Sequence, residues 1–411
     1  MKKKIPYAWW VVTACGLIGF LKGGIVSYGF TAFFEPLVHE FGWSYTEISF
    51  AKSLRGVEMS IFAPFVGFLV DRVGTRKLLL LGIITVGFGL TLLSITQSLV
   101  MFYLSFLFLA FGAGGVGGVV LTTTVASWFE NNMGKALGVL TCLSAAGGLL
   151  IPLVVWLIDV FQWRTALVIL GVGICVIGIP LALSIREKRD HDKSDVTLLN
   201  HTLSSPEHVG TVTEIGFKDA IKHRVYFYLN FIEFIRHMIT SAIVLHIMPY
   251  LSSINVPKST AVLVTVSFPI FNIAGRFGFG WFADVSDQRK TMIFTLALMG
   301  LGLLGLCYAR QTWTLLIFSF LFSMGWGGGV ILSRTMQREY FGMNSFGKML
   351  GIIMGLGSLG GVIGPTLAGW IFDTMRSYYI MWLIFFGLCL LSIGLILTMK
   401  PAIERNPETI F

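Results

Sequence analysis

Hydrophobic positions along the 411-residue chain fall into long runs that short polar segments separate. The runs are close to the roughly 20 residues that an α-helix needs to cross the hydrocarbon core of a bilayer. The pattern predicts an all-α polytopic membrane protein with twelve transmembrane helices. The predicted spans are 8–34, 46–70, 78–97, 99–127, 136–158, 164–185, 226–250, 259–283, 291–309, 313–335, 347–372 and 378–399.

Composition supports this class, because charged residues make up only 12% of the chain, about half the share in a soluble domain. With the N-terminus inside, 21 of the 30 Lys and Arg residues fall on inner segments and 4 on outer loops. The positive-inside rule therefore predicts that both termini are cytoplasmic. The net charge of +9 is then an orientation signal that needs no nucleic-acid partner. We expect a monomer in the inner membrane of a prokaryote, surrounded by the lipid bilayer.

The two halves of the chain repeat each other with an offset of 213 residues. The segment 67–77 corresponds to 280–290, and the same offset relates Gly148 to Gly361 and Pro152 to Pro365. A duplicated unit of six spans gives two pseudo-symmetric bundles with the same orientation in the membrane. The predicted domains are an N-terminal bundle at 1–185, a cytoplasmic central loop with an interfacial helix at 186–225, and a C-terminal bundle at 226–411.

The segment 67–77 reads G-x-x-x-D-R-x-G-x-R-K, and its copy at 280–290 is weaker. This loop, its copy and the long central loop resemble the major facilitator superfamily. The resemblance implies a central cavity between two bundles that rock between inward-open and outward-open states. A carboxylate near a helix N-terminus and clustered cations suit a gate, although a tight turn with orienting charges is the alternative. The expected gating residues are Gly67, Asp71, Arg72, Gly74, Arg76, Lys77, Asp284 and Arg289.

Five basic residues, Lys22, Lys52, Arg55, Arg236 and Arg276, lie inside the predicted spans and away from the ends of those spans. An ionisable side chain at this depth costs several kcal/mol unless it is paired or solvated, so each is a candidate functional residue. Arg276 is the most informative, because Asn272 shares its helix face and no acidic residue lies within four positions on that face. A guanidinium fork matches a carboxylate, so the sequence indicates an anionic substrate there.

The run Phe271-Asn272-x-x-x-Arg276 resembles the monocarboxylate transporter and oxalate:formate antiporter branch of the superfamily. The resemblance implies that Arg276 binds a substrate carboxylate. The chain departs from the branch at Asn272, where carriers have an aspartate, and at Tyr28, which aligns with their lysine. It also lacks the second cation that oxalate exchangers have in span eleven, so a single carboxylate fits better than a dicarboxylate. The remaining expected substrate contacts are Tyr28, His246, Tyr250, Trp326 and Lys22, which alternatively snorkels.

Proton coupling needs a titratable group in the cavity, and His246 and Glu58 are the candidates. A hydrogen-bonded core histidine and an ion pair between Glu58 and Arg55 are the alternatives. We expect a secondary active transporter of an organic monocarboxylate that works by proton symport and alternating access. An anion exchanger without proton coupling is the nearest alternative, and a membrane carboxylate sensor is one of another class. No enzyme, cofactor or metal motif occurs, and the cysteines have no ligand spacing.

Overall fold

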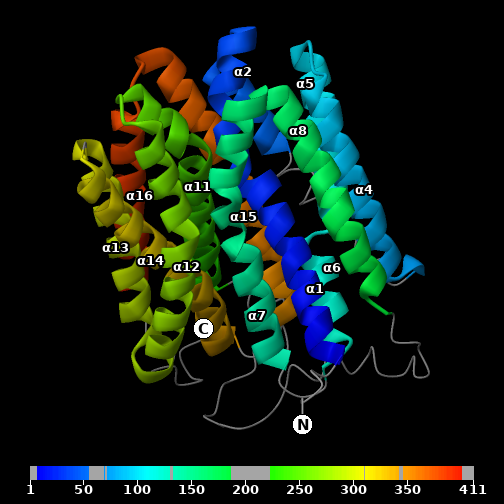
Figure 1. Cartoon of the computed structure of the whole chain (residues 1–411). Helices are drawn as coiled ribbons and strands as arrows, with labels where there is room; N and C mark the ends of the chain where they lie inside the picture. Colours follow the sequence, from blue (N-terminus) through cyan, green and yellow to red (C-terminus); the bar gives the residue numbers. More distant parts are fainter. Residues whose placement is uncertain are drawn as a thin grey trace. The chain divides into compact units, whose positions relative to one another are not determined.

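The structure is a computed structural model that describes residues 7–54, 69, 72–129, 133–186, 223–309, 311–341 and 346–399. Within these ranges the description leaves out the side chains of 133–134, 283–285, 338, 341, 346–351 and 354. Every regular element in the described part of the chain is a helix (Figure 1), which confirms the predicted all-α class. This follows from long apolar runs whose backbone groups have no water to bind in lipid, so each run must satisfy its own hydrogen bonds.

The first helical stretch runs without a break from Tyr7 to Phe41, seven residues further than predicted. It comprises α1 (Tyr7–Lys22), a π-helical segment η1 (Gly23–Tyr28), a 3-10 segment η2 (Gly29–Phe33) and α2 (Phe34–Phe41). It ends at Gly42, whose φ of 66° is a conformation that glycine adopts readily. A further helix covers residues 45–54 and begins the predicted second span.

The other helices follow the predicted spans closely. In the first half they are α4 (Thr75–Ser94), α5 (Leu99–Gly115), α6 (Gly118–Ala126), α7 (Met133–Ala145), the 3-10 turn η3 (Ala146–Leu150) and α8 (Ile151–Ser184). In the second half they are α11 (Arg224–Ser253), α12 (Lys258–Val285), α13 (Gln288–Tyr308), α14 (Thr312–Phe341), α15 (Phe346–Met375) and α16 (Tyr379–Leu397).

Ten helical stretches of the described chain are long and apolar enough to cross a membrane. Two differences separate this number from the twelve predicted spans. Most of the span expected at 46–70 lies outside the described residues. The spans expected at 136–158 and 164–185 form one stretch that bends at Gln162, whose φ of 62° and ψ of 160° are not helical. The bend falls between the two predicted spans, so the twelve-helix fold is consistent with the structure.

The bend at Gln162 is held in place by Arg164, which lies two residues further along the chain. Arg164 donates hydrogen bonds to the carbonyl oxygens of Ser94 and Thr96, at 2.6 and 2.9 Å, where α4 ends. Its guanidinium also binds the carboxylate of Glu40 at 2.7 Å. These bonds satisfy carbonyl groups that a helix C-terminus leaves without partners.

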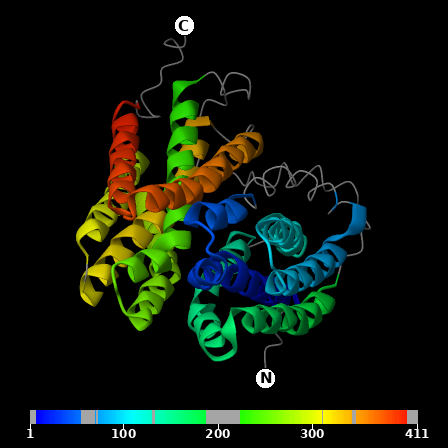
Figure 2. The same cartoon turned by 90° about the horizontal axis from the view of Figure 1, so that it is seen from above.

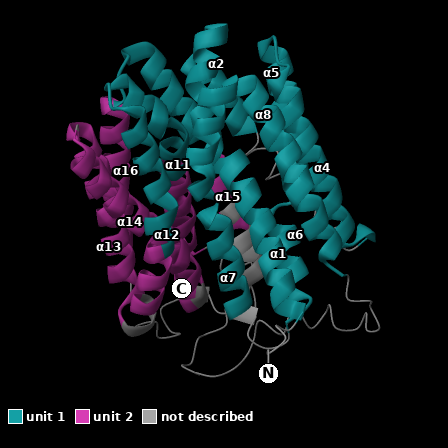
Figure 3. Cartoon of the chain, in the orientation of Figure 1, with its two compact units in different colours: residues 1–188, 240–273, 361–378 teal, residues 189–239, 274–360, 379–411 magenta. Residues whose placement is uncertain are grey.

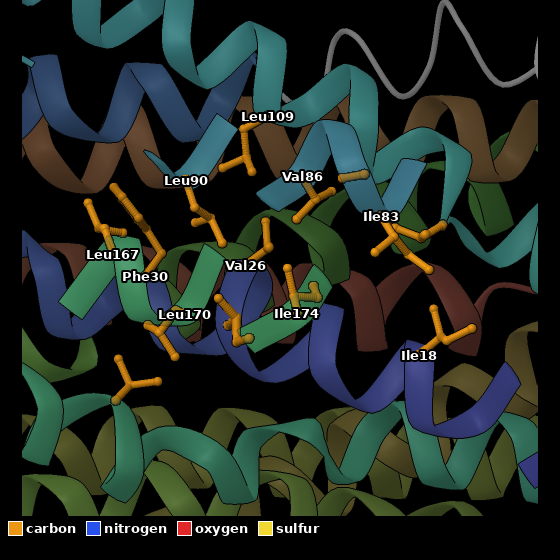
Figure 4. Packing of buried hydrophobic residues seen from close by; sticks show 14 of the residues in the cluster. Ile18, Val26, Phe30, Ile83, Val86, Leu90, Leu109, Leu167, Leu170 and Ile174 are labelled. Carbon is orange, nitrogen blue, oxygen red and sulfur yellow. The ribbon is translucent and has the colours of Figure 1, made fainter. Parts of the chain in front are cut away.

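The chain divides into two compact units (Figure 3). Unit 1 contains residues 1–188, 240–273 and 361–378, so it takes one part each of α11, α12 and α15 from the second half. Its core gathers apolar side chains of α1 to η2, α4, α5 and α8, among them Ile18, Phe30, Ile83, Leu109 and Ile174 (Figure 4). Within this unit α4 packs against both α5 and α8.

Unit 2 contains residues 189–239, 274–360 and 379–411. Its core includes Tyr226 and Leu229 of α11, Leu296 of α13 and Leu332 of α14. Within this unit α13 packs against α14 and α16, whose ribbons are yellow to red in Figure 2. The predicted boundary between two bundles, the loop at 186–225 with its interfacial helix, falls almost wholly outside the described residues.

Candidate functional site

Arg276 and Asn272 lie one turn apart on α12. Asn272 is fully buried and Arg276 is half-buried. Gly275, next to Arg276, is packed so closely on α14 that an added Cβ would lie 2.9 Å from the Cα of Met324. Because backbone atoms cannot move aside, only glycine fits this contact. The sequence thus places Arg276 where α12 lies directly on α14 within unit 2.

Lys22 and Tyr28 frame the π-helical segment of the first stretch. Lys22 is the last residue of α1, Tyr28 is the last of η1, and both side chains are half-buried. A π segment adds a residue to a helical turn and so turns the following side chains to another face, and such segments are frequent at functional sites. The hydrophobic pattern predicted a plain helix here and gave no signal of this change.

His246 of α11 lies at the centre of a buried polar network in unit 1. Its Nε2 is 3.0 Å from the carbonyl oxygen of Pro365 and 3.0 Å from Oγ of Ser49, and its Nδ1 is 2.9 Å from the hydroxyl of Tyr378. A carbonyl oxygen only accepts, so this bond fits a neutral ring that donates from Nε2 and accepts from Tyr378 at Nδ1. The side chain has no exposed surface.

Tyr378 also connects His246 with Tyr250, a second predicted site residue. The rings of Tyr250 and Tyr378 are perpendicular, with centroids 5.7 Å apart. Tyr250 follows His246 by one helical turn, so both side chains reach Tyr378 from the same face of α11. The structure therefore brings these two predicted residues together through a third that sequence reasoning missed.

The helix at 45–54 is fastened to α15 at both of its described ends. At the start, Asp373 accepts hydrogen bonds from the backbone N–H groups of Tyr45 and Thr46, at 3.0 and 2.8 Å. Further along, Ser53 Oγ lies 2.5 Å from the carbonyl oxygen of Val362 and 2.8 Å from the hydroxyl of Thr366. All these residues belong to unit 1.

A buried ion pair that the sequence analysis did not identify lies in unit 2. Glu233 and Arg236 of α11 are 8% and 2% exposed. Arg236 Nη2 is 2.8 and 2.9 Å from the two carboxylate oxygens of Glu233, and Nη1 donates to the carbonyl of Trp326 at 3.1 Å. The ring of His237 reaches Glu233 at 3.2 Å. The signal was the spacing Glu-x-x-Arg-His, which puts all three on one face of a helix.

The gating residues are only partly described. Glu58, Gly67 and Asp71 lie outside the described residues, and so does the side chain of Asp284. Gly74 has a φ of 87° immediately before α4, and the guanidinium of Arg76 donates to the carbonyl of Leu183 at 2.9 Å. The other described members are Arg72 and Lys77, which are exposed, and Arg289, whose backbone N–H donates to Asp287.

Arg334 is one of the 21 basic residues assigned above to inner segments, at the end of the span predicted at 313–335. The structure places it inside α14, within the stretch Thr312–Gln337 that is apolar enough to span a membrane. The helix continues past the predicted end of this span at residue 335 and reaches Phe341. No group of three potential metal ligands gathers among the described residues.

The chain is similar to known proteins over nearly its whole length. The family model of the Major Facilitator Superfamily matches residues 15–247 and 229–410. Monocarboxylate transporter 12 of Mus musculus is 24% identical, covering 98% of this chain and 87% of the relative. An uncharacterized MFS-type transporter, YcxA of Bacillus subtilis, is 23% identical over 92% of this chain and 91% of its own. Human monocarboxylate transporter 2 is 25% identical, and the match covers 92% of this chain and 82% of the relative.

Two solved structures share the fold. The nucleoside transporter NupG superposes with a TM-score of 0.76 at 12% identity, covering 94% of this chain and 99% of that one. A bacterial homologue of the lysosomal transporter Spinster, inward-facing and occupied, gives 0.75 at 12% identity and covers 98% of both chains. The family match extends over both halves, as the predicted duplication requires. This multi-pass chain belongs to the Major Facilitator Superfamily and is a membrane transporter rather than an enzyme.

Proposed function

We propose that this protein moves an organic monocarboxylate across the cytoplasmic membrane by proton symport and alternating access. The observation that carries the proposal is Arg276, an arginine within a membrane-spanning helix of a chain that is similar to proteins named monocarboxylate transporters. A guanidinium keeps its charge in such a place and offers two parallel donors to a carboxylate. The proposed cell is prokaryotic, with both termini in the cytoplasm and a monomeric carrier.

The carboxylate binds Arg276, and Asn272 on the same face of α12 contributes an amide. Lys22, Tyr28, Tyr250 and Trp326 are the proposed contacts for the rest of the substrate. One arginine in α12 suits one carboxylate, because an arginine fork is matched by the two oxygens of a single carboxyl group. A substrate with one carboxyl group and an uncharged remainder is therefore favoured over a compact dicarboxylate.

His246 is the described residue that the sequence analysis proposed for proton coupling. An imidazolium donates from both nitrogens, so a proton on Nδ1 requires the hydroxyl of Tyr378 to turn from donor to acceptor. The carbonyl of Pro365 keeps its bond in either state. If His246 carried the proton, its protonation would act on Tyr378 and on the contacts of helix 45–54 in unit 1. The loop at 67–77 is the proposed gate of the inner side.

A thermal-shift screen of the purified protein with carboxylic acids that differ in chain length and ring content tests the substrate class. We expect monocarboxylates to raise the unfolding temperature and dicarboxylates of equal length to have a smaller effect, since ligands of the folded state stabilise it. Uptake of a stabilising acid into proteoliposomes then separates transport from sensing. Counterflow at a rate that does not depend on pH would favour the anion exchanger. Stabilisation by an acid without any uptake of that acid would favour the carboxylate sensor.

A further inference from the structure

We propose that His237, held against the buried pair of Glu233 and Arg236, binds the proton that accompanies the carboxylate. The inference rests on the proposed symport and names its proton site. His237 is the fourteenth of thirty residues in α11, so it lies at the middle of a membrane-spanning helix. Histidine is the side chain whose charge ordinarily changes between about pH 5 and pH 8.

The carboxylate of Glu233 is a fixed negative charge at this site. Both of its oxygens accept N–H groups of Arg236, at 2.8 and 2.9 Å from Nη2 and 3.2 Å from Nε. A carboxylate with charge-assisted bonds to a guanidinium stays ionised. Arg236 is therefore a positioning residue that keeps Glu233 charged and fixes its oxygens toward His237.

The side chain of His237 is much more exposed than those of Glu233 and Arg236. Its side chain is 46% exposed, whereas the side chains of Arg236 and Glu233 are 2% and 10% exposed. The Nε2 atom lies 3.2 Å from Oε1 of Glu233. The neutral ring donates its Nε2 proton to Oε1, and this bond persists and strengthens when the ring becomes an imidazolium.

The charges around the ring of His237 determine whether the proton and the carboxylate favour or oppose each other's binding. From α14, Arg334 lies within electrostatic reach of Glu233 and Arg236, and the uncharged Gly357 of α15 lies against the ring. With a neutral ring the three charged side chains sum to one positive charge, and a proton on His237 raises this to two. A second positive charge in unit 2, which also contains Arg276, favours the binding of an anion there. By linkage, a bound carboxylate favours the proton equally.

His246 offers the informative comparison within the same helix. Its ring has no exposed surface, and its partners at both nitrogens are neutral groups. His237 instead has a charged partner that stabilises an imidazolium and an exposed side through which the proton arrives. These two contrasts are the reason to assign the transported proton to His237.

The test measures two fluxes in proteoliposomes that contain the full chain and a trapped pH dye. Labelled L-lactate, pyruvate and benzoate are the probes. In His237→Gln we expect carboxylate-driven proton flux to fall by about tenfold or more, a typical size for coupling between two ligands. Counterflow of labelled for unlabelled acid should persist in this variant. His39→Gln, which removes an exposed histidine from α2, is the matched control and should behave as the wild type.

A second variant excludes a merely structural role. His237→Lys carries a permanent positive charge, so its affinity for the acid in counterflow should no longer fall as pH rises, whereas that of the wild type should. The inference is overturned if His237→Gln has the same proton flux as the wild type. It is also overturned if proton flux is lost in His246→Gln and kept in His237→Gln. A wild type that exchanges acids without proton flux overturns the inference and the symport but leaves the carrier. A wild type that moves none of the acids overturns the proposed function as well.

Discussion

The carboxylate of Asp373 caps the first turn of the helix at 45–54 through Thr46, which donates both its backbone N–H, at 2.8 Å, and its hydroxyl, at 2.5 Å. The two residues are 327 positions apart and belong to the same unit. A helix N-terminus carries unpaired N–H groups and a partial positive charge, so a carboxylate there satisfies both. One side chain of α15 thus fixes the start of the second span.

Removal of this cap should cost stability. We expect Asp373→Ala to lower the free energy of unfolding by about 1–2 kcal/mol, the range for loss of a helix cap. Asp373→Asn retains an acceptor oxygen and should lose less. Thermal unfolding in detergent measures both. Equal unfolding temperatures for the wild type and Asp373→Ala would show that the contact does not stabilise the protein.

Gly369 of α15 sits where the same contact brings two backbones together. An added Cβ would lie 2.7 Å from the carbonyl oxygen of Tyr45 and 2.9 Å from the Cα of Thr46. Gly369→Ala should therefore lower the unfolding temperature clearly. Gly361→Ala is the matched control on the same helix, because nothing lies within 4 Å of its added Cβ. It should be neutral or slightly stabilising, since alanine favours a helix over glycine by about 1 kcal/mol. Equal effects of both substitutions would contradict the close approach.

The buried pair in α11 predicts a non-additive response. Arg236→Met removes the hydrogen-bonded guanidinium from the buried carboxylate of Glu233 and should cost about 3–5 kcal/mol, as for other buried pairs that lose one partner. The double variant with Glu233→Gln removes that charge and should recover most of the loss. Unfolding temperatures of the two single variants and the double variant complete the cycle. Additive losses would mean that the two side chains do not stabilise each other.

Glu339 gives a stability change that depends on pH. It lies near the end of α14, where burial, followed by the negative charge of Asp287, raises the pKa of its carboxyl group. A carboxyl with a raised pKa in the folded state stabilises the fold at low pH and loses that contribution as pH rises through the raised value. Glu339→Gln should thus be slightly more stable than the wild type at neutral pH, by less than about 1 kcal/mol because the side chain is half exposed. The difference should disappear below about pH 4. A lower unfolding temperature of Glu339→Gln at neutral pH would contradict this account.

Much of the fold was predictable because its signals are local. The lengths of the apolar runs and the charged residues between them predicted the positions of α11 to α16 to within a few residues. The exception is α14, which extends past the predicted end at residue 335 to Phe341. The bend at Gln162 was anticipated only as a gap between two spans, since its cause is the contact of Arg164 with residues 68 and 70 positions earlier.

The site was less predictable, because its parts depend on tertiary contacts. The sequence drew attention to Arg276 and His246 through the rarity of charged and titratable groups in apolar runs. It could not indicate that Pro365 and Tyr378 bind the ring of His246, since they are 119 and 132 residues away. Arg236 was noticed as a charge inside a span, but Glu233 was not, although their spacing of three residues could have identified the pair.

Uptake of a labelled monocarboxylate by proteoliposomes containing Arg276→Gln or Arg276→Lys shows whether Arg276 binds the transported carboxylate. The acid is the one that stabilises the wild type most in the thermal-shift screen, and an unchanged unfolding temperature without ligand shows that the variants fold. We predict that Arg276→Gln abolishes specific binding and uptake, and that Arg276→Lys retains a small part, because an ammonium keeps the charge without the planar fork. Uptake by a folded Arg276→Gln at the wild-type rate would contradict the assignment of the carboxylate to Arg276.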